Sequence, residues 1–162
     1  MKRLIGCAAL GLVACILCQA TAGGEGSEGQ QQRPYTFMAD SYWFVLNIDP
    51  SSPDFGQMEE WGTGVATHRG KVSNHGGGHM NMQTGVYTGS GVATDASGEQ
   101  TFWWIEDLFS PTAVVHIDGG TGRFEGATGE LTNFEFTNEQ VEVQWPYQIT
   151  TCELTATGWL IY

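Results

Sequence analysis

Apolar and polar residues alternate along most of the chain beyond its first thirty or so residues. The clearest run is 141–149, in which every odd-numbered residue is apolar and every even-numbered one is Glu, Gln or Pro. A period of two predicts a strand with one buried face and one solvated face. Residues 131–137 and 152–160 repeat the pattern, and residues 66–72 and 80–87 follow it as well.

The remaining segments also favour strands, because none shows the 3.6-residue period of an amphipathic helix. Residues 35–48 and 99–107 are apolar on both faces, and residues 112–118 are rich in β-branched side chains. Clusters of Gly, Asn, Asp and Ser predict turns between the strands at 74–78, 89–91, 95–98 and 118–122. Eight or nine short strands with many small inward residues predict an all-β fold, an eight-stranded closed antiparallel barrel of the calycin or dirigent type over residues 35–162.

Seven residues occupy the same alternate positions as the apolar residues of their predicted strands. A register slip of one residue would turn the whole set outward, so the register is firmly set. We expect these residues to face the barrel interior, as core or as the walls of a ligand pocket: His68, Met80, Met82, Phe134, Phe136, Trp145 and Tyr147. For His68 the favoured interpretation is a hydrogen-bonded core residue, since acid–base chemistry needs a cleft that reaches it.

The first residues have the arrangement of a secretory signal peptide. A short basic head precedes an apolar run that ends at Leu17, and the Ala-Thr-Ala at 20–22 suits a signal peptidase. We predict a leader over residues 1–22, cleavage after Ala22, and a secreted or periplasmic protein. The apolar run is too short to span a bilayer. The alternative is a lipid anchor at Cys15, because Leu-Val-Ala-Cys resembles a bacterial lipobox.

Composition excludes some classes of binding partner for the mature chain. Only 15% of residues are charged, the net charge is −12, and removal of Lys2 and Arg3 with the leader takes it to −14. Nucleic-acid binding needs a basic surface and anionic lipid needs clustered Lys and Arg, so neither partner is expected.

Residues 23–34, mostly Gly, Glu and Gln, predict a flexible linker. Three of the four cysteines lie in the leader, so Cys152 has no internal partner and is expected to be buried and inert.

Three histidines could be interpreted as a metal site, because His75 and His79 flank a glycine triplet not far from His68. A glycine triplet cannot form a helix that stacks two imidazoles, and no cysteine is near. Exposed histidines in a hairpin loop are the favoured interpretation, and no metal or cofactor is predicted.

Two further pairs of neighbours follow from strand geometry. The adjacent carboxylates Glu59 and Glu60 diverge in an extended chain, which favours solvated charges over an acid–base pair. Trp103 and Trp104 must point to opposite faces, so one indole lies outside the barrel, where a subunit contact would cover it. A homo-oligomer is therefore one expectation.

The glycine-rich run at 119–131 is the sharpest local motif. It lacks the spacing of a phosphate loop and leads into a strand, so its glycines predict tight turns and Phe124 predicts a plug at one barrel end. The motif residues are Gly119, Gly120, Gly122, Arg123, Phe124, Gly126 and Gly129.

This run resembles the signature of allene-oxide-cyclase-like and dirigent-like β-barrels, especially their small secreted bacterial relatives. Residues 66–71 and 158–162 resemble an early and a closing strand of the same superfamily. The resemblance implies an eight-stranded antiparallel barrel that is often oligomeric. Plant members cyclise an unsaturated epoxide or steer phenoxy-radical coupling, but no stretch here matches their catalytic residues.

Two functional hypotheses follow. The first is a non-catalytic protein that binds a small apolar molecule or assembles through its barrel wall. The second is a cyclase or isomerase that acts on a small unsaturated molecule in the barrel mouth. A binder needs apolar walls and one orienting polar group, whereas a cyclase needs a carboxylate or imidazole within hydrogen-bond reach of its substrate.

Overall fold

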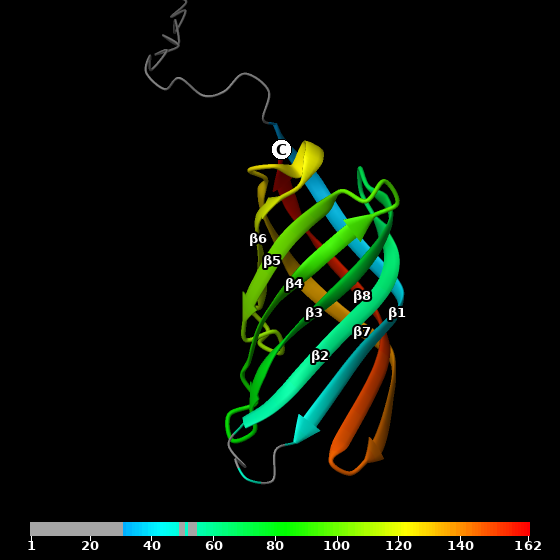
Figure 1. The fold of residues 1–162 in the computed structure, drawn as a ribbon, viewed down its shortest axis with the longest axis vertical. Helices are drawn as coiled ribbons and strands as arrows, with labels where there is room; N and C mark the ends of the chain where they lie inside the picture. Colours follow the sequence, from blue (N-terminus) through cyan, green and yellow to red (C-terminus); the bar gives the residue numbers. More distant parts are fainter. Residues whose placement is uncertain (1–30, 49–50, 52–54) are drawn as a thin grey trace, which may run out of the picture.

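The computed structural model describes residues 31–48, 51 and 55–162, which form a closed barrel of eight antiparallel strands (Figure 1). Each strand pairs with the next, and the last returns to pair with the first. The strands are β1 (Gln32–Ile48), β2 (Phe55–Ala66), β3 (Gly70–Asn81), β4 (Tyr87–Asp95), β5 (Gln100–Glu106), β6 (Val114–Gly120), β7 (Thr128–Gln144) and β8 (Tyr147–Ile161). The predicted all-β closed barrel is confirmed.

Alternate side chains of each strand point into the barrel. In β8, Cys152 and Leu154 are buried while Glu153 between them is exposed. In β5, Trp103 is buried and Trp104 is 40% exposed on the outer wall. The prediction that the two tryptophans point to opposite faces is confirmed, and a subunit contact at Trp104 stays a prediction.

The glycine-rich motif closes one end of the barrel, as predicted. A 3₁₀ turn, η1 (Gly122–Phe124), connects β6 to β7 at the top of Figure 1. Phe124 is fully buried, and its ring centroid lies 5.0 Å from that of Tyr162. Two guanidinium groups, of Arg69 and Arg123, each lie 4.7 Å from the same ring. Cation–π contacts of this kind hold the plug in place.

The opposite end carries a long hairpin. Within the described chain, β7 pairs with β6 over 128–131, whereas its pairing with β8 continues to Gln144. The outer half of the hairpin therefore projects past the barrel (Figure 1). Two irregularities in its register, between Thr132 and Glu135 and between Thr137 and Gln140, are β-bulges.

Trp145 and Tyr147 do not face the interior, contrary to prediction. Residues 141–149 are not one strand, because Gln144 pairs with Tyr147 across a two-residue turn formed by Trp145 and Pro146. Proline, which lacks an N–H, suits a turn better than a ladder. The turn lies at the hairpin tip beyond the barrel, so Trp145 is 69% exposed and Tyr147 is also exposed.

His68 is also placed differently from its prediction. β2 ends at Ala66 and β3 begins at Gly70, and His68 lies exposed in the turn between them with φ of 65°. Strand parity does not continue through a turn. The buried residue is its neighbour Arg69, which donates to Thr101 Oγ1 over 2.7 Å.

Met82 is likewise outside the strand in which it was predicted. β3 ends at Asn81, whose Oδ1 accepts the backbone N–H groups of Gln83 (3.0 Å) and Thr84 (3.1 Å). An Asn side chain that bonds the backbone two residues on is a turn former. Met82 therefore lies exposed in the β3–β4 turn, whereas Met80 packs against the core.

Two glycine-rich runs predicted as turns, 74–78 and 89–91, lie inside β3 and β4 instead. The reason is space. A Cβ at Gly76 or Gly91 would collide with the indole ring of Trp103. Glycine on two neighbouring strands thus provides the room for one large inward ring.

The structure describes only part of the amino-terminal segments that the sequence predicts. β1 begins at Gln32, so the last three residues of the predicted linker 23–34 belong to a strand. The predicted leader, its cleavage after Ala22 and the alternative anchor at Cys15 lie outside the described residues. Among the residues that the structure does describe, no helix is long and apolar enough to cross a bilayer.

Gly91→Ala should destabilise the barrel by about 1–3 kcal/mol, the usual cost of overpacking a filled core. The new methyl group would collide with the Trp103 ring and with the backbone of β3. Urea unfolding followed by circular dichroism would measure the loss. Ser90→Ala, at the exposed neighbouring position, is the control and should change stability by less than about 0.5 kcal/mol. Equal small effects at both positions would contradict the packing argument.

Candidate functional site

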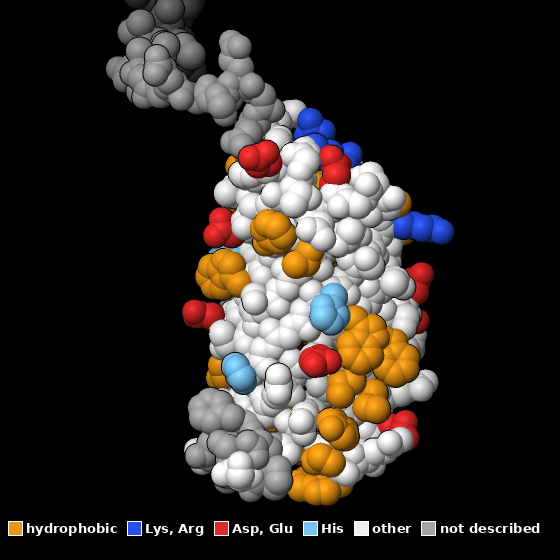
Figure 2. All heavy atoms as spheres, in the orientation of Figure 1, with side chains coloured by type: hydrophobic (Ala, Val, Ile, Leu, Met, Phe, Trp, Pro, Cys, Tyr) orange, Lys and Arg blue, Asp and Glu red, His pale blue; other side chains and the backbone are white. Residues whose placement is uncertain are grey.

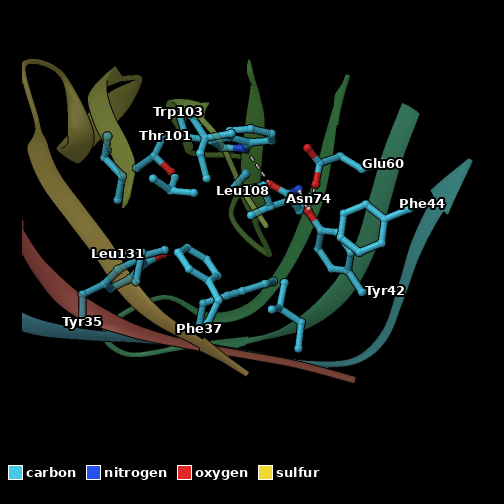
Figure 3. A pocket seen from close by; sticks show the side chains of 16 residues that line it. Tyr35, Phe37, Tyr42, Phe44, Glu60, Asn74, Thr101, Trp103, Leu108 and Leu131 are labelled. Carbon is cyan, nitrogen blue, oxygen red and sulfur yellow. Dashed lines mark hydrogen bonds between the residues drawn. The ribbon is translucent and has the colours of Figure 1, made fainter. Parts of the chain in front are cut away.

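The barrel encloses a small cavity with mostly apolar walls (Figure 3). Its volume is about 60 Å³, enough for a few water molecules and well below the roughly 150 Å³ that accommodates benzene. The lining residues are Tyr35, Phe37, Tyr42, Phe44, Glu60, Asn74, Ala93, Thr101, Trp103, Ile105, Leu108, Val115, Ile117, Leu131, Phe134 and Leu154.

A chain of hydrogen bonds crosses one side of this cavity. Tyr42 Oη donates to Glu60 Oε2 (2.7 Å), and Tyr87 Oη donates to Glu60 Oε1 (2.9 Å). Asn74 Nδ2 donates to Tyr42 Oη, and Trp103 Nε1 donates to Asn74 Oδ1 (2.7 Å). Figure 3 shows Glu60, Asn74 and Tyr42 directed at one another from neighbouring strands. Five side chains from five strands thus form one buried polar network.

Strand register and glycine together place the two tyrosines of this network. Tyr42 pairs with Gly62 across β1 and β2, and a Cβ at Gly62 would collide with its ring. Tyr87, at the start of β4, lies over Gly89 in the same way. Without these glycines neither ring could lie against the wall with its hydroxyl on Glu60.

Glu60 is 3% exposed, and its burial dominates its electrostatics. Burial raises the pKa of its carboxyl above the ordinary value, while the hydrogen bonds from Tyr42 and Tyr87 and the charge of His75 oppose the rise. Burial and the neighbouring carboxylate likewise raise the pKa of both tyrosines. The site therefore favours a carboxyl that retains its proton to higher pH than a solvated one.

A second cavity opens at the hairpin end. Its volume is about 310 Å³, and we call it the mouth. Its residues are Phe44, Leu46, Met58, Met80, Phe109, Phe136, Glu139, Val141, Gln148 and Thr150. The walls are mostly apolar, with polar groups supplied by the projecting β7–β8 hairpin.

Phe44 lies between the two cavities, since it lines both. Its ring centroid is 6.0 Å from those of Phe109 and Phe136, and 5.1 Å from that of Tyr42 in the polar network. Phe109, in the β5–β6 connection, is 47% exposed. Phe44 therefore separates the mouth from the inner cavity that Glu60 lines.

Of the residues predicted to form a site, three line these cavities. Phe134 lines the inner cavity, and Met80 and Phe136 line the mouth. The other four, His68, Met82, Trp145 and Tyr147, lie in exposed turns or at the hairpin tip and line neither cavity.

The weaker chemical candidates also have defined positions. His75 and His79 are exposed on β3, not in a loop, and no group of three or more potential ligands among the described residues could hold a metal. Cys152 is buried, and burial together with the charge of Glu139 raises the pKa of its thiol to about 11. A thiol with so high a pKa is inert at neutral pH, which agrees with the sequence expectation.

Sequence reasoning missed the central residue of the network. Glu59 and Glu60 do diverge, with Glu59 exposed, but the interpretation of both as solvated charges is wrong for Glu60. A signal was present, because Glu60 shares parity with Met58, Gly62 and Ala66, a face of apolar and small residues. A lone carboxylate on such a face indicates a buried site rather than a solvated charge.

Glu60→Gln should become progressively more stable relative to the native protein as pH rises. A carboxyl whose folded pKa exceeds its ordinary value of 4.5 loses stabilising free energy as pH increases from 4.5 through the raised value. Gln cannot ionise and escapes this loss. Urea unfolding at about pH 4 and about pH 8 would measure the difference. Glu59→Gln is the matched control, and a constant difference between Glu60→Gln and native protein would contradict the assignment.

Comparisons with protein-family models and with curated proteins give no match to this chain. The likeness of the glycine-rich run to allene-oxide-cyclase-like and dirigent-like barrels therefore stays a prediction about family.

Proposed function

We propose that the barrel binds a small, largely apolar molecule that carries one polar, hydrogen-bonding group. The observation behind this proposal is Glu60, a buried carboxylate with two tyrosine partners at the edge of an apolar cavity. Apolar residues of similar volume usually serve stability as well as a buried charge or better. A few convergent polar groups in an apolar pocket are the usual arrangement of a small-molecule site.

Each of the two cavities would bind a different part of the ligand. The mouth, at about 310 Å³, reaches the lower end of the range for small-molecule pockets, roughly 300–1,000 Å³. The inner cavity is too small for more than a minor group. The apolar body of the ligand would lie against Met80 and Phe136, and displacement of Phe44 would bring its polar group to Glu60.

N-Phenyl-1-naphthylamine, a neutral apolar dye with one N–H donor, is a suitable probe because its fluorescence rises in apolar surroundings. The native protein should increase this fluorescence saturably. Phe136→Glu, which puts a charge in the mouth, should weaken dye binding at least about ten-fold, or about 1.4 kcal/mol. Phe102→Glu makes the same change at an exposed position on β5 and should leave binding unchanged. Titration of dye with each protein gives the dissociation constants.

Two results would contradict the binding proposal. The native protein could fail to enhance the dye, or the two Phe→Glu variants could weaken binding equally. Circular dichroism of both variants would establish that the barrel is intact.

A second candidate, a cyclase or isomerase, is favoured by the position of Glu60 in the wall of the inner cavity, where burial raises the pKa of its carboxyl. In its protonated form this carboxyl can donate a hydrogen bond to an oxygen on which negative charge develops. In the cyclisation of an unsaturated epoxide, a C–O bond breaks and its electron pair moves to oxygen. A C–C bond then forms from the π electrons, so the product is an isomer and no co-reactant is consumed.

Incubation with an unsaturated epoxide, followed by chiral chromatography, would test the second candidate. Catalysis inside the barrel predicts an excess of one enantiomer of the cyclic product. Glu60→Gln should return the product to the racemic mixture formed in buffer. A racemic product with the native protein would exclude this reaction on the epoxide while leaving the binding proposal intact.

A further inference from the structure

The outer wall of the barrel carries a pair of exposed tryptophans. Trp43 on β1 and Trp61 on β2 are register partners, 38% and 37% exposed. Their ring centroids lie 6.1 Å apart and their planes differ by 6°. Trp43 Nε1 donates to Ser41 Oγ over 3.0 Å, which fixes the orientation of that ring. Figure 2 shows hydrophobic side chains gathered over β1 and β2 on the face in view, beside a histidine.

A shallow hollow of mixed polarity adjoins this pair along the strands. Its volume is about 490 Å³; Asp40, Thr63, Lys71, Ser73, Thr94 and Asp95 supply polar groups, and Val65, Val72 and Ala96 supply apolar ones. Thr63, Ser73 and Thr94 are register partners across β2, β3 and β4. Thr63 is two residues from Trp61 on the same face of β2, about 7 Å along the strand. The aromatic pair and the hollow are thus neighbours on one wall.

The combination selects for one kind of ligand. The face of an indole is electron-rich and attracts the polarised C–H groups of a sugar ring. Hydroxyl, carboxylate and ammonium groups together offer donors and acceptors for sugar hydroxyls. A purely apolar ligand would make no use of the row of hydroxyl groups that Thr63, Ser73 and Thr94 form across three strands. An acidic polysaccharide would be repelled by a chain with net charge −12.

We propose that Trp43, Trp61 and the adjoining hollow form a binding site for a neutral saccharide. The site lies on the outside of the barrel and does not depend on the proposed interior function. One sugar residue packs against the indole pair, whose two rings are stacked on one another, and the next reaches the hydroxyl groups of the hollow. The fixed orientation of Trp43 lowers the ordering cost of binding.

Isothermal titration calorimetry with cellohexaose, maltohexaose and mannohexaose tests this site. At least one of the three should bind, and Trp61→Ala should weaken that binding at least ten-fold. Thr63→Val, which removes one hydroxyl from the hollow while keeping its volume, should also weaken it and serves if Trp61→Ala does not fold. Trp104→Ala removes an equally exposed indole on β5 and should have no effect.

Several results would overturn the proposal. These are absence of heat with all three hexasaccharides, equal loss in Trp61→Ala and Trp104→Ala, or unaltered binding in Thr63→Val. A dimer of the native chain that Trp61→Ala dissociates would show that a second copy covers the pair instead. A bound hexasaccharide should not displace N-phenyl-1-naphthylamine, which separates this site from the barrel interior.

Discussion

The limited volume inside a barrel of eight strands is the constraint on which the rest of the structure depends. Such a barrel has room for little more than its own side chains. This chain places large rings there, and it makes space for them with glycine on the neighbouring strands. Trp103 lies against Gly76 and Gly91, and Tyr42 lies against Gly62. Glycines that look like loop composition in the sequence, such as Gly76 and Gly91, therefore serve packing inside the strands.

The same constraint brings the polar groups together. Rings that lie flat against the glycine wall carry their hydroxyl and N–H groups to one region, where Tyr42 and Tyr87 reach Glu60. A buried carboxylate without such partners would be costly, whereas a fully bonded one fixes the position of every member of the network. The packing of aromatic rings against glycine therefore determines both the fixed positions of the hydrogen-bonded side chains and the size of the inner cavity beside them.

The fold was predictable from the sequence to a greater extent than the site. Period-two alternation identifies strands wherever one face is buried, as in β8, and the glycine-rich run at 119–131 indicates the plugged end. Alternation does not predict which side chains point inward where the sequence pattern gives no sign that a strand has ended. Thr67 to Arg69 and Trp145 to Pro146 are turns, so His68 and Trp145 are exposed although their spacing matches an inward face.

Glu60 shows a different limit of sequence reasoning. A carboxylate is taken as solvated unless its partners are known, and its partners come from strands 18 and 27 residues away. Local pattern does not reveal which hydroxyl groups a closed sheet will bring within reach. The parity of Glu60 with Met58 was the available sign, and it becomes decisive only after the register of the barrel is fixed.

The projecting hairpin has an unpaired strand edge, and such edges tend to pair with strands of other chains. Beyond Leu131, the described β7 has β8 as its one ladder partner, so its other edge offers backbone groups that a further strand could bond. Two bulges interrupt the ladder between β7 and β8 and bend β7, and Asn133 and Asn138 adopt φ of 50° and 53° there. Exposed Glu135, Glu139 and Glu142 add like charges along it. An irregular, acidic edge of this kind discourages intermolecular β-sheet growth, which allows a strand pair to extend into solvent without seeding aggregation.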